Sequence, residues 1–302
     1  MVIGNKNFDF SAPHVYVMGI LNVTPDSFSD GGKYMSSDSI LRHVDQMIEA
    51  GADIIDIGGE STRPGFQIVT PEDEARRVCE AISIIKQRYD IPISIDTYKA
   101  CVLEVAINSG ADIANDVWGL KLDNEKYKGY QGDENRRYGD VVAKTNVPII
   151  LMHNSRPTPS EERAGIDKHS DSAKYDNYGL YIKKFISEMD EMVKRAESYG
   201  ISRDMIISDP GVGFGKTQEE NLAIIKYLPD IVNASDVPVL LGTSRKSVIG
   251  KALGDIDVNS REEGTLVTTV LAAQAGCSIV RVHDVEKNVR AIKMLEAITG
   301  IS

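Results

Sequence analysis

Five cationic side chains stand where apolar runs of this sequence end, and cations gathered in one place would bind an anion. They are Arg63, Arg245, Lys246, Arg281 and His283. The chain has 302 residues and a net charge of −11, so a cluster of positive charge in it needs a local reason. Arginine and lysine suit phosphate or pyrophosphate. For any one of these residues alone a structural ion pair is the better explanation, but five together favour an anionic ligand.

Four aspartates also lie at or near the ends of apolar runs, and they offer acceptors to a polar ligand. They are Asp56, Asp96, Asp116 and Asp209. Asp209 is held by a tight Pro-Gly turn, so its carboxylate can accept two parallel N–H groups from the amidine-like edge of a heterocycle. Asn115 both donates and accepts, and can read a neighbouring edge. We therefore interpret Asp96 and Asp209 as ligand-binding, and Asp56 and Asp116 as residues that cap helices or orient loops.

The glycine run of residues 211–217 looks like a phosphate-binding loop but lacks the required spacing. A Walker motif needs glycine at Pro210, and the dinucleotide fingerprint needs glycine at Lys216. We interpret the run as a flexible connection that lets Phe214 lie against a flat ligand. No serine–histidine–acid triad and no metal-binding histidine spacing is visible.

Eight apolar, β-branched runs lead into these polar clusters, and helical stripes separate the runs. They cover residues 15–21, 53–57, 92–97, 111–114, 148–152, 205–207, 238–241 and 278–280. Runs that are apolar on both faces are typical of buried parallel strands. Eight strand–helix units predict an α/β fold, a (β/α)8 TIM barrel formed as a single domain by residues 1–302, with a doubly wound open sheet as the alternative. The strand ends of a barrel meet at one rim, so the polar clusters should gather there.

Four predicted rim loops are longer than a barrel needs. They follow strands one, two, four and five and cover residues 22–32, 58–65, 121–139 and 155–176. Long loops are more often functional than short ones. We interpret Val23 to Gly32 as a lid with Phe28 as its contact. The last two loops, rich in charged residues, Gly and Pro, are expected to be extended or mobile surface excursions.

The composition excludes several function classes. A content of 42% hydrophobic residues is enough for a large core, and the acidic balance argues against binding to nucleic acid or a membrane surface. No apolar run approaches the roughly 20 residues that cross a bilayer, and no signal peptide is visible. Three widely spaced cysteines in apolar contexts indicate buried thiols in a reducing compartment, so we expect a cytoplasmic protein.

Taken together, the motifs closely resemble those of the dihydropteroate synthase family. The matching segments are residues 22–32, 58–65, 94–97, 115–116, 209–216, 242–246 and 281–284. They occur in the family's order and span nearly the whole chain. The resemblance implies a transferase of folate biosynthesis that condenses 6-hydroxymethyl-7,8-dihydropterin pyrophosphate with 4-aminobenzoate and releases pyrophosphate. It also implies Mg²⁺ as cofactor, sulfonamides as competitors of aminobenzoate, and a homodimer.

The family's residue roles carry over where the residues match. The pterin would be held by Asp96, Asn115, Asp209 and Lys246. The pyrophosphate would be bound by Asn22, Arg63, Arg281 and His283, with Asn22 also a magnesium ligand. The aminobenzoate pocket would be shaped by Phe28, Thr62, Pro64 and Ser247. Catalysis is expected to depend on Lys246, Arg281, Asp96 and Arg63. An aniline nitrogen is neutral at pH 7, so no strong protein base is required.

Two other functions remain open at this stage. A pterin-dependent methyltransferase domain shares a pterin-binding barrel but should lack the paired loops 22–32 and 61–65. A barrel that only binds pterin should lack one of the pyrophosphate residues, and all are present. One departure from the family pattern is Asn154-Ser155-Arg156, where some members have a Met-Gln-Gly-like continuation.

Overall fold

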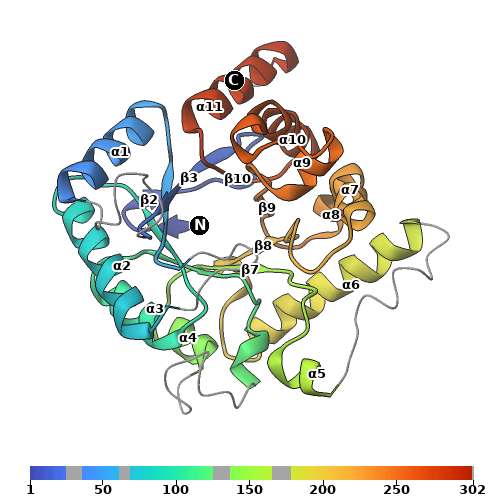
Figure 1. The fold of residues 1–302 in the computed structure, drawn as a ribbon. Helices are drawn as coiled ribbons and strands as arrows, with labels where there is room; N and C mark the ends of the chain where they lie inside the picture. The colour runs from blue at the N-terminus through green and yellow to red at the C-terminus, as the bar shows by residue number, and fades with distance from the viewer. Residues whose placement is uncertain (25–35, 61–68, 125–136, 165–177, 301–302) are drawn as a thin grey trace.

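The computed structural model describes residues 1–24, 36–60, 69–124, 137–164 and 178–300. Eight parallel strands form one sheet in the order β8-β7-β6-β5-β4-β3-β10-β9. A bridge between Ser208 and Val239 joins its two edges. The sheet is therefore a barrel, which confirms the predicted TIM-barrel fold and makes the open-sheet alternative wrong. Helices surround the barrel (Figure 1).

The barrel strands fall where the apolar runs predict them. They are β3 (Tyr16–Asn22), β4 (Ile54–Gly58), β5 (Ile93–Asp96), β6 (Ile113–Asp116), β7 (Ile149–Met152), β8 (Ile206–Asp209), β9 (Leu240–Leu241) and β10 (Ile279–Val282). Most of their residues are buried, because side chains fill the barrel on one face and helices cover the other.

The described helices follow the predicted stripes, with additions. The α-helices are α1 (Ser37–Glu49), α2 (Pro71–Lys86), α3 (Ala100–Asn108), α4 (Tyr138–Thr145), α5 (Pro159–Arg163), α6 (Tyr178–Glu197), α7 (Gln218–Lys226), α8 (Leu228–Ala234), α9 (Ser247–Ala252), α10 (Glu262–Ala275) and α11 (Val285–Thr299). The 3-10 helices are η2 (Lys121–Asn124), η4 (Arg203–Met205) and η5 (Val258–Ser260). The side chains of Ser36 and Thr70 cap the N-termini of α1 and α2. No described helix is both long enough and apolar enough to cross a membrane.

An N-terminal hairpin that the sequence patterns did not reveal closes one end of the barrel. It pairs β1 (Val2–Ile3) with β2 (Lys6–Asn7) in antiparallel fashion. Ile3 and Phe8 are buried in a cluster with residues near the amino ends of the barrel strands, among them Met18 and Ile54. The hairpin thus covers the end opposite the predicted rim.

The described parts of the two long excursions are folded, contrary to the expectation of extended segments. Residues 121–124 form η2, and the carboxylate of Asp123 accepts the backbone N–H groups of Tyr138 and Gly139 at 2.6 and 2.8 Å. Thr158 begins α5 with a capping box. The Asp123 contacts thus join the two described ends of the first excursion, and the capping box orders the start of the second.

Candidate active site

Four residues at or next to the ends of neighbouring strands lie in one row across the rim. The strand register pairs Asn22 with Gly58, Gly58 with Asp96, and Asp96 with Asn115. Gly58 leaves a gap in this row, because a Cβ atom built on it would lie 3.5 Å from Asn22 Oδ1 and 3.7 Å from Asp96 Cβ. The barrel therefore brings the three predicted polar residues Asn22, Asp96 and Asn115 together at one level.

Arg281, in β10, is fixed inside the mouth by two carboxylates. Its Nε donates to Asp56 Oδ2 at 2.6 Å, and its Nη2 donates to Asp96 Oδ2 at 2.7 Å. Asp56 is completely buried and also accepts from Asn115 Nδ2 at 3.2 Å. The interpretation of Asp56 as a cap or loop-orienting residue is therefore wrong. Asp116 does take that role, since it accepts the backbone N–H groups of residues 118 and 120.

Burial and neighbouring charges shift the pKa values of Asp96 and Arg281 in opposite directions. Burial raises the pKa of Asp96 to about 7, although the Arg281 guanidinium opposes the rise. Burial also opposes the charge of Arg281, but the carboxylates of Asp56 and Asp96 outweigh it and raise its pKa above the ordinary arginine value. Arg281 therefore stays cationic, while Asp96 can exchange a proton near neutral pH.

Asp209, at the end of β8, presents one carboxylate edge toward the mouth. Its Oδ1 accepts the Gly211 N–H at 2.7 Å. A Cβ atom built on Gly242 would lie 3.6 Å from Asp209 Oδ2 and 3.8 Å from Arg281 Cβ. A second glycine gap thus separates Asp209 from Arg281. Burial raises the pKa of Asp209, and the nearby Lys246 charge opposes the rise.

Lys246 lies directly before α9, with its ammonium group over the aromatic ring of Phe214. The distance from Nζ to the ring centroid is 4.6 Å, and Nζ also donates to the Val212 carbonyl. Burial lowers the pKa of Lys246 to about 8, although Asp209 favours the charged form. Arg156 lies over the same ring at 5.2 Å. The predicted contacts Lys246 and Phe214 therefore lie beside Asp209, in contact with one another.

The glycine run is a closely packed set of turns, and our interpretation of it as a flexible connection is wrong. Gly211, Gly213 and Gly215 all have left-handed φ angles, of 64°, 88° and 65°. A Cβ atom on Gly211 would lie 2.0 Å from the carbonyl oxygen of His153. Lys216 Nζ donates to the carbonyls of His153 and Gly211 at 2.8 and 2.9 Å. The turns thus fold around a lysine, whose pKa burial lowers to about 7.

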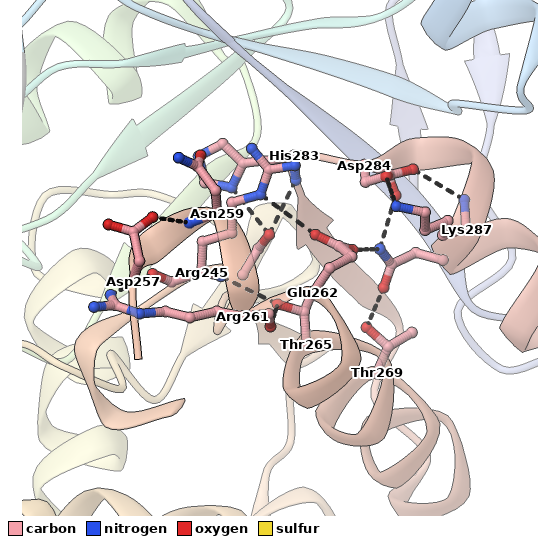
Figure 2. A network of polar contacts seen from close by, with 12 residues as sticks. Arg245, Asp257, Asn259, Arg261, Glu262, Thr265, Thr269, His283, Asp284 and Lys287 are labelled. Atoms are coloured by element: carbon pink, nitrogen blue, oxygen red, sulfur yellow. Dashed lines mark hydrogen bonds and ion pairs between the residues drawn. The ribbon is translucent and has the colours of Figure 1, made fainter. Parts of the chain in front are cut away.

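His283, directly after β10, and Arg245 lie next to each other (Figure 2). The Oγ atom of Ser244 is 2.9 Å from His283 Nδ1 and accepts the His283 backbone N–H at 3.1 Å. The Arg245 guanidinium is paired with Glu262, with Nε and Oε2 3.3 Å apart. Ser247, predicted to contact aminobenzoate, is exposed at the first position of α9.

Four predicted site residues lie outside the described residues, namely Phe28, Thr62, Arg63 and Pro64. The residues that flank the second rim loop are described, and they converge on Lys99. Its completely buried Nζ contacts the carboxylates of Glu60 and Glu74 and the carbonyl of Val69. Sequence reasoning missed this buried cluster, because no local spacing marks a lysine that binds residues about 25 to 40 positions away.

The described residues contain no group of three histidine, cysteine or acidic side chains that would hold a metal by itself. A magnesium ion bound together with a substrate phosphate needs few protein ligands, since Mg²⁺ keeps several waters. The amide oxygen of Asn22, at the rim beside Asp96, suits that coordination. The residues present thus fit a magnesium ion that is held mainly by the substrate.

The chain is similar to known proteins over nearly its whole length. Residues 18–283 match the family model described as pterin binding enzyme. The dihydropteroate synthase of Clostridium beijerinckii is 46% identical over 99% of both chains. A crystal structure of the Clostridium difficile dihydropteroate synthase with pteroic acid has a TM-score of 0.77 and 42% identity, covering 94% of this chain and 96% of that one. The Yersinia pestis dihydropteroate synthase in a sulfonamide drug complex has a TM-score of 0.80 and 34% identity, covering 100% and 99%.

Proposed function

The chain belongs to the dihydropteroate synthase family, and from this premise we propose which part of the substrates each rim residue binds. The protein is a transferase of folate biosynthesis. It condenses 6-hydroxymethyl-7,8-dihydropterin pyrophosphate with 4-aminobenzoate to give 7,8-dihydropteroate and pyrophosphate. The observation that carries the residue roles is the convergence of Asp96, Asn115 and Asp209 with Arg281 in a single mouth.

The polar edges of the pterin bind to Asp96 and Asn115 of the rim row and to the carboxylate of Asp209. Asp209 Oδ1 is already held by the Gly211 N–H, so the carboxylate has a fixed direction. Its two oxygens suit the adjacent N–H groups of the pterin. Asn115 and Asp96 read a neighbouring edge, and Lys246 donates to the pterin ring oxygen. Phe214 packs near the pterin while supporting the Lys246 ammonium.

The pyrophosphate binds to the cations on the opposite side of the mouth. A guanidinium has five N–H donors, and Asp56 and Asp96 contact the donors on Nε and Nη2. Arg281 therefore keeps donors for an anion while its two carboxylate partners hold it in place. Asn22, Arg63 and His283 complete this part of the site, and the amide oxygen of Asn22 would also hold Mg²⁺. When bound, Mg²⁺ supplies positive charge to the leaving pyrophosphate.

The condensation exchanges one bond for another at the pterin methylene carbon. The bond from that carbon to the pyrophosphate oxygen breaks, and its electron pair leaves with the pyrophosphate. The cations of the mouth stabilise this developing charge. The neutral aromatic amine then forms the C–N bond and loses a proton. Because the amine is uncharged at pH 7, the site needs no strongly basic residue to activate it.

Pyrophosphate release measured with each substrate alone and with both tests the reaction. We expect release that requires both the pterin pyrophosphate and 4-aminobenzoate, with dihydropteroate formed in equal amount. Release without 4-aminobenzoate would indicate another acceptor, such as a methyltransferase-like barrel would use. Binding of the pterin without any release would indicate a binding protein.

We propose in addition that the protein is a homodimer, formed through α7, α9 and α10. These helices lie together in Figure 1. Exposed apolar side chains gather on them and at the end of α9, namely Leu222, Leu253, Val267 and Leu271. Sedimentation of Val267→Glu should show a monomer. The matched control Leu180→Glu changes an exposed leucine on α6 and should leave the dimer intact. A monomeric parent protein would contradict the proposal.

Sulfonamides compete with 4-aminobenzoate for the pocket that Ser247, Phe28, Thr62 and Pro64 shape. Steady-state inhibition should be competitive toward 4-aminobenzoate and not toward the pterin substrate. We also place the protein in the cytoplasm, and the three cysteines, Cys79, Cys101 and Cys277, support this because they form no disulfide with one another. Fractionation of the producing cell tests that location.

A further inference from the structure

The first half of helix α10 buries a polar stripe, unlike an ordinary barrel helix, whereas its second half buries Ala272 and Ala275. Its buried residues include Glu262, Thr265, Thr268 and Thr269, which with Arg261 recur at the spacing of one helical face. Its outer face instead exposes Val267 and Leu271. Polar side chains are buried at a cost unless they are hydrogen-bonded. The polar side chains on the inward face of α10 therefore need hydrogen-bond partners inside the fold.

The main partner of this stripe is a turn of residues 243–246. The Lys246 N–H donates to the Thr243 carbonyl at 3.1 Å, and Arg245 has a left-handed φ of 57°. Glycine or asparagine is usual at such a position, and an arginine there is strained. Strain of this kind persists only where surrounding contacts hold it.

Three residues at the start of α10 hold Arg245 by three different groups. Thr265 Oγ1 accepts its backbone N–H at 3.1 Å, and Arg261 Nη1 donates to its carbonyl at 3.0 Å. Glu262 Oε2 binds its Nε at 3.3 Å. Figure 2 shows these side chains converging on Arg245 from α10. The backbone N–H, the carbonyl and the Nε atom of Arg245 are thus all held by α10 and its N-cap residue Arg261.

The same stripe also fixes the neighbouring parts of the rim. Thr268 Oγ1 is 2.7 Å from Thr243 Oγ1, at the start of the turn. Glu262 Oε1 accepts from Asn288 Nδ2 at 3.1 Å, and Asn288 Oδ1 accepts from Thr269 at 2.7 Å. Asn288 in turn donates to the carbonyl of Asp284, directly after His283.

We propose that Thr265 and Glu262 are positioning residues for Lys246, and that α10 sets the Lys246 side chain against the pterin by holding Arg245 in its left-handed conformation. Neither residue touches substrate. The proposal rests on the pterin-binding role of Lys246 given above. Its consequence is that these two α10 residues, outside the family's pterin contacts, control the affinity for the pterin substrate.

Thr265→Val and Thr265→Ser test the proposal as a matched pair. Valine keeps the shape but removes the oxygen that accepts from Arg245, whereas serine keeps it. We expect Thr265→Val to raise the KM and the calorimetric Kd for the pterin pyrophosphate tenfold or more, with a smaller change in kcat. Thr265→Ser should restore both within about threefold, a difference of less than about 1 kcal/mol.

Glu262→Gln and Glu263→Gln form a second pair on adjacent residues. Glutamine at 262 replaces one of two acceptors with a donor and should weaken pterin binding, whereas Glu263 is exposed and its change should have no effect. Pterin binding by Thr265→Val equal to that of the parent, or a serine variant as weak as the valine variant, would overturn the proposal. If the parent binds the pterin pyrophosphate but forms no dihydropteroate, the proposed function fails, while the binding comparison still decides this inference.

Discussion

Arg281 and Asp56 are joined by a 2.6 Å hydrogen bond inside the barrel, although 225 positions separate them in the sequence. Asp56 is completely buried, so it cannot contact a ligand directly. It fixes the guanidinium and, through Oδ1, also accepts from Asn115. One aspartate thus connects the proposed pyrophosphate and pterin sides of the site.

Replacing Asp56 with asparagine should therefore impair both stability and turnover. The change leaves a buried arginine with one carboxylate, and the free energy of unfolding should fall by about 3 kcal/mol. We expect kcat/KM to fall on the order of 100-fold. The control is Asp190→Asn, because Asp190 pairs with Lys194 on the surface of α6 and such pairs contribute about 0–1 kcal/mol. Full activity in Asp56→Asn would contradict the role of Asp56.

Asp209→Asn should strongly weaken pterin binding while leaving the fold intact. An amide offers one acceptor and one donor in place of two acceptors, so it opposes one N–H group of the pterin. We expect calorimetry to show at least a 100-fold weaker Kd for the pterin pyrophosphate. The KM for 4-aminobenzoate, measured at saturating pterin, should change much less. Normal pterin affinity would refute the assignment.

The rate should fall as the pH rises through about 8. Burial lowers the pKa of Lys246 to about 8, so above that pH the side chain is neutral. A neutral amine loses the charge that strengthens its hydrogen bond to the pterin oxygen. The pH profile of kcat/KM should therefore show an alkaline limb near 8. In Lys246→Arg the limb should move to higher pH, since arginine stays charged, and a limb that does not move would assign it to another group.

Gly211→Ala and Gly200→Ala separate backbone strain from steric overlap. Both glycines have left-handed φ angles, of 64° and 84°. The Cβ atom at position 211 would overlap the His153 carbonyl oxygen, whereas none lies within 4 Å at position 200. Gly200→Ala should cost about 1 kcal/mol of unfolding free energy. Gly211→Ala should cost more and weaken pterin binding, because Asp209 Oδ1 is held by the Gly211 N–H. Equal effects would show that the overlap relaxes freely.

Phe8→Ala should destabilise the protein without changing its chemistry. Phe8 is buried in the cluster that closes the end of the barrel away from the site. Truncating a buried phenylalanine costs about 3–5 kcal/mol. Chemical denaturation should show that loss, while kcat/KM per folded molecule stays unchanged. Val2 is exposed on the same hairpin, so Val2→Ala should leave stability within about 0.5 kcal/mol of the parent.

The order and apolarity of the strands were enough to predict the barrel. Parallel strands that are buried on both faces consist of nearly continuous apolar residues, and such runs are visible in the sequence. The same reasoning named Asp96, Asn115 and Asp209, since strand ends converge wherever a barrel closes. The N-terminal hairpin escaped this reasoning. Its strands have only two residues each, too short for a periodic pattern.

Only the tertiary structure decided which of the similar side chains meet. Four aspartates follow apolar runs, but barrel closure alone places Asp56 and Asp96 on Arg281. The glycines of residues 211–215 are visible in the sequence. Gly211 is needed, however, because the His153 carbonyl, directly after β7, lies where a Cβ atom would be, and only the folded chain brings the two together. The contacts of α10 with Arg245 likewise depend on how helix and loop pack. A periodic pattern depends on neighbouring residues and is therefore visible in the sequence, whereas hydrogen bonds between distant residues form only when the chain folds.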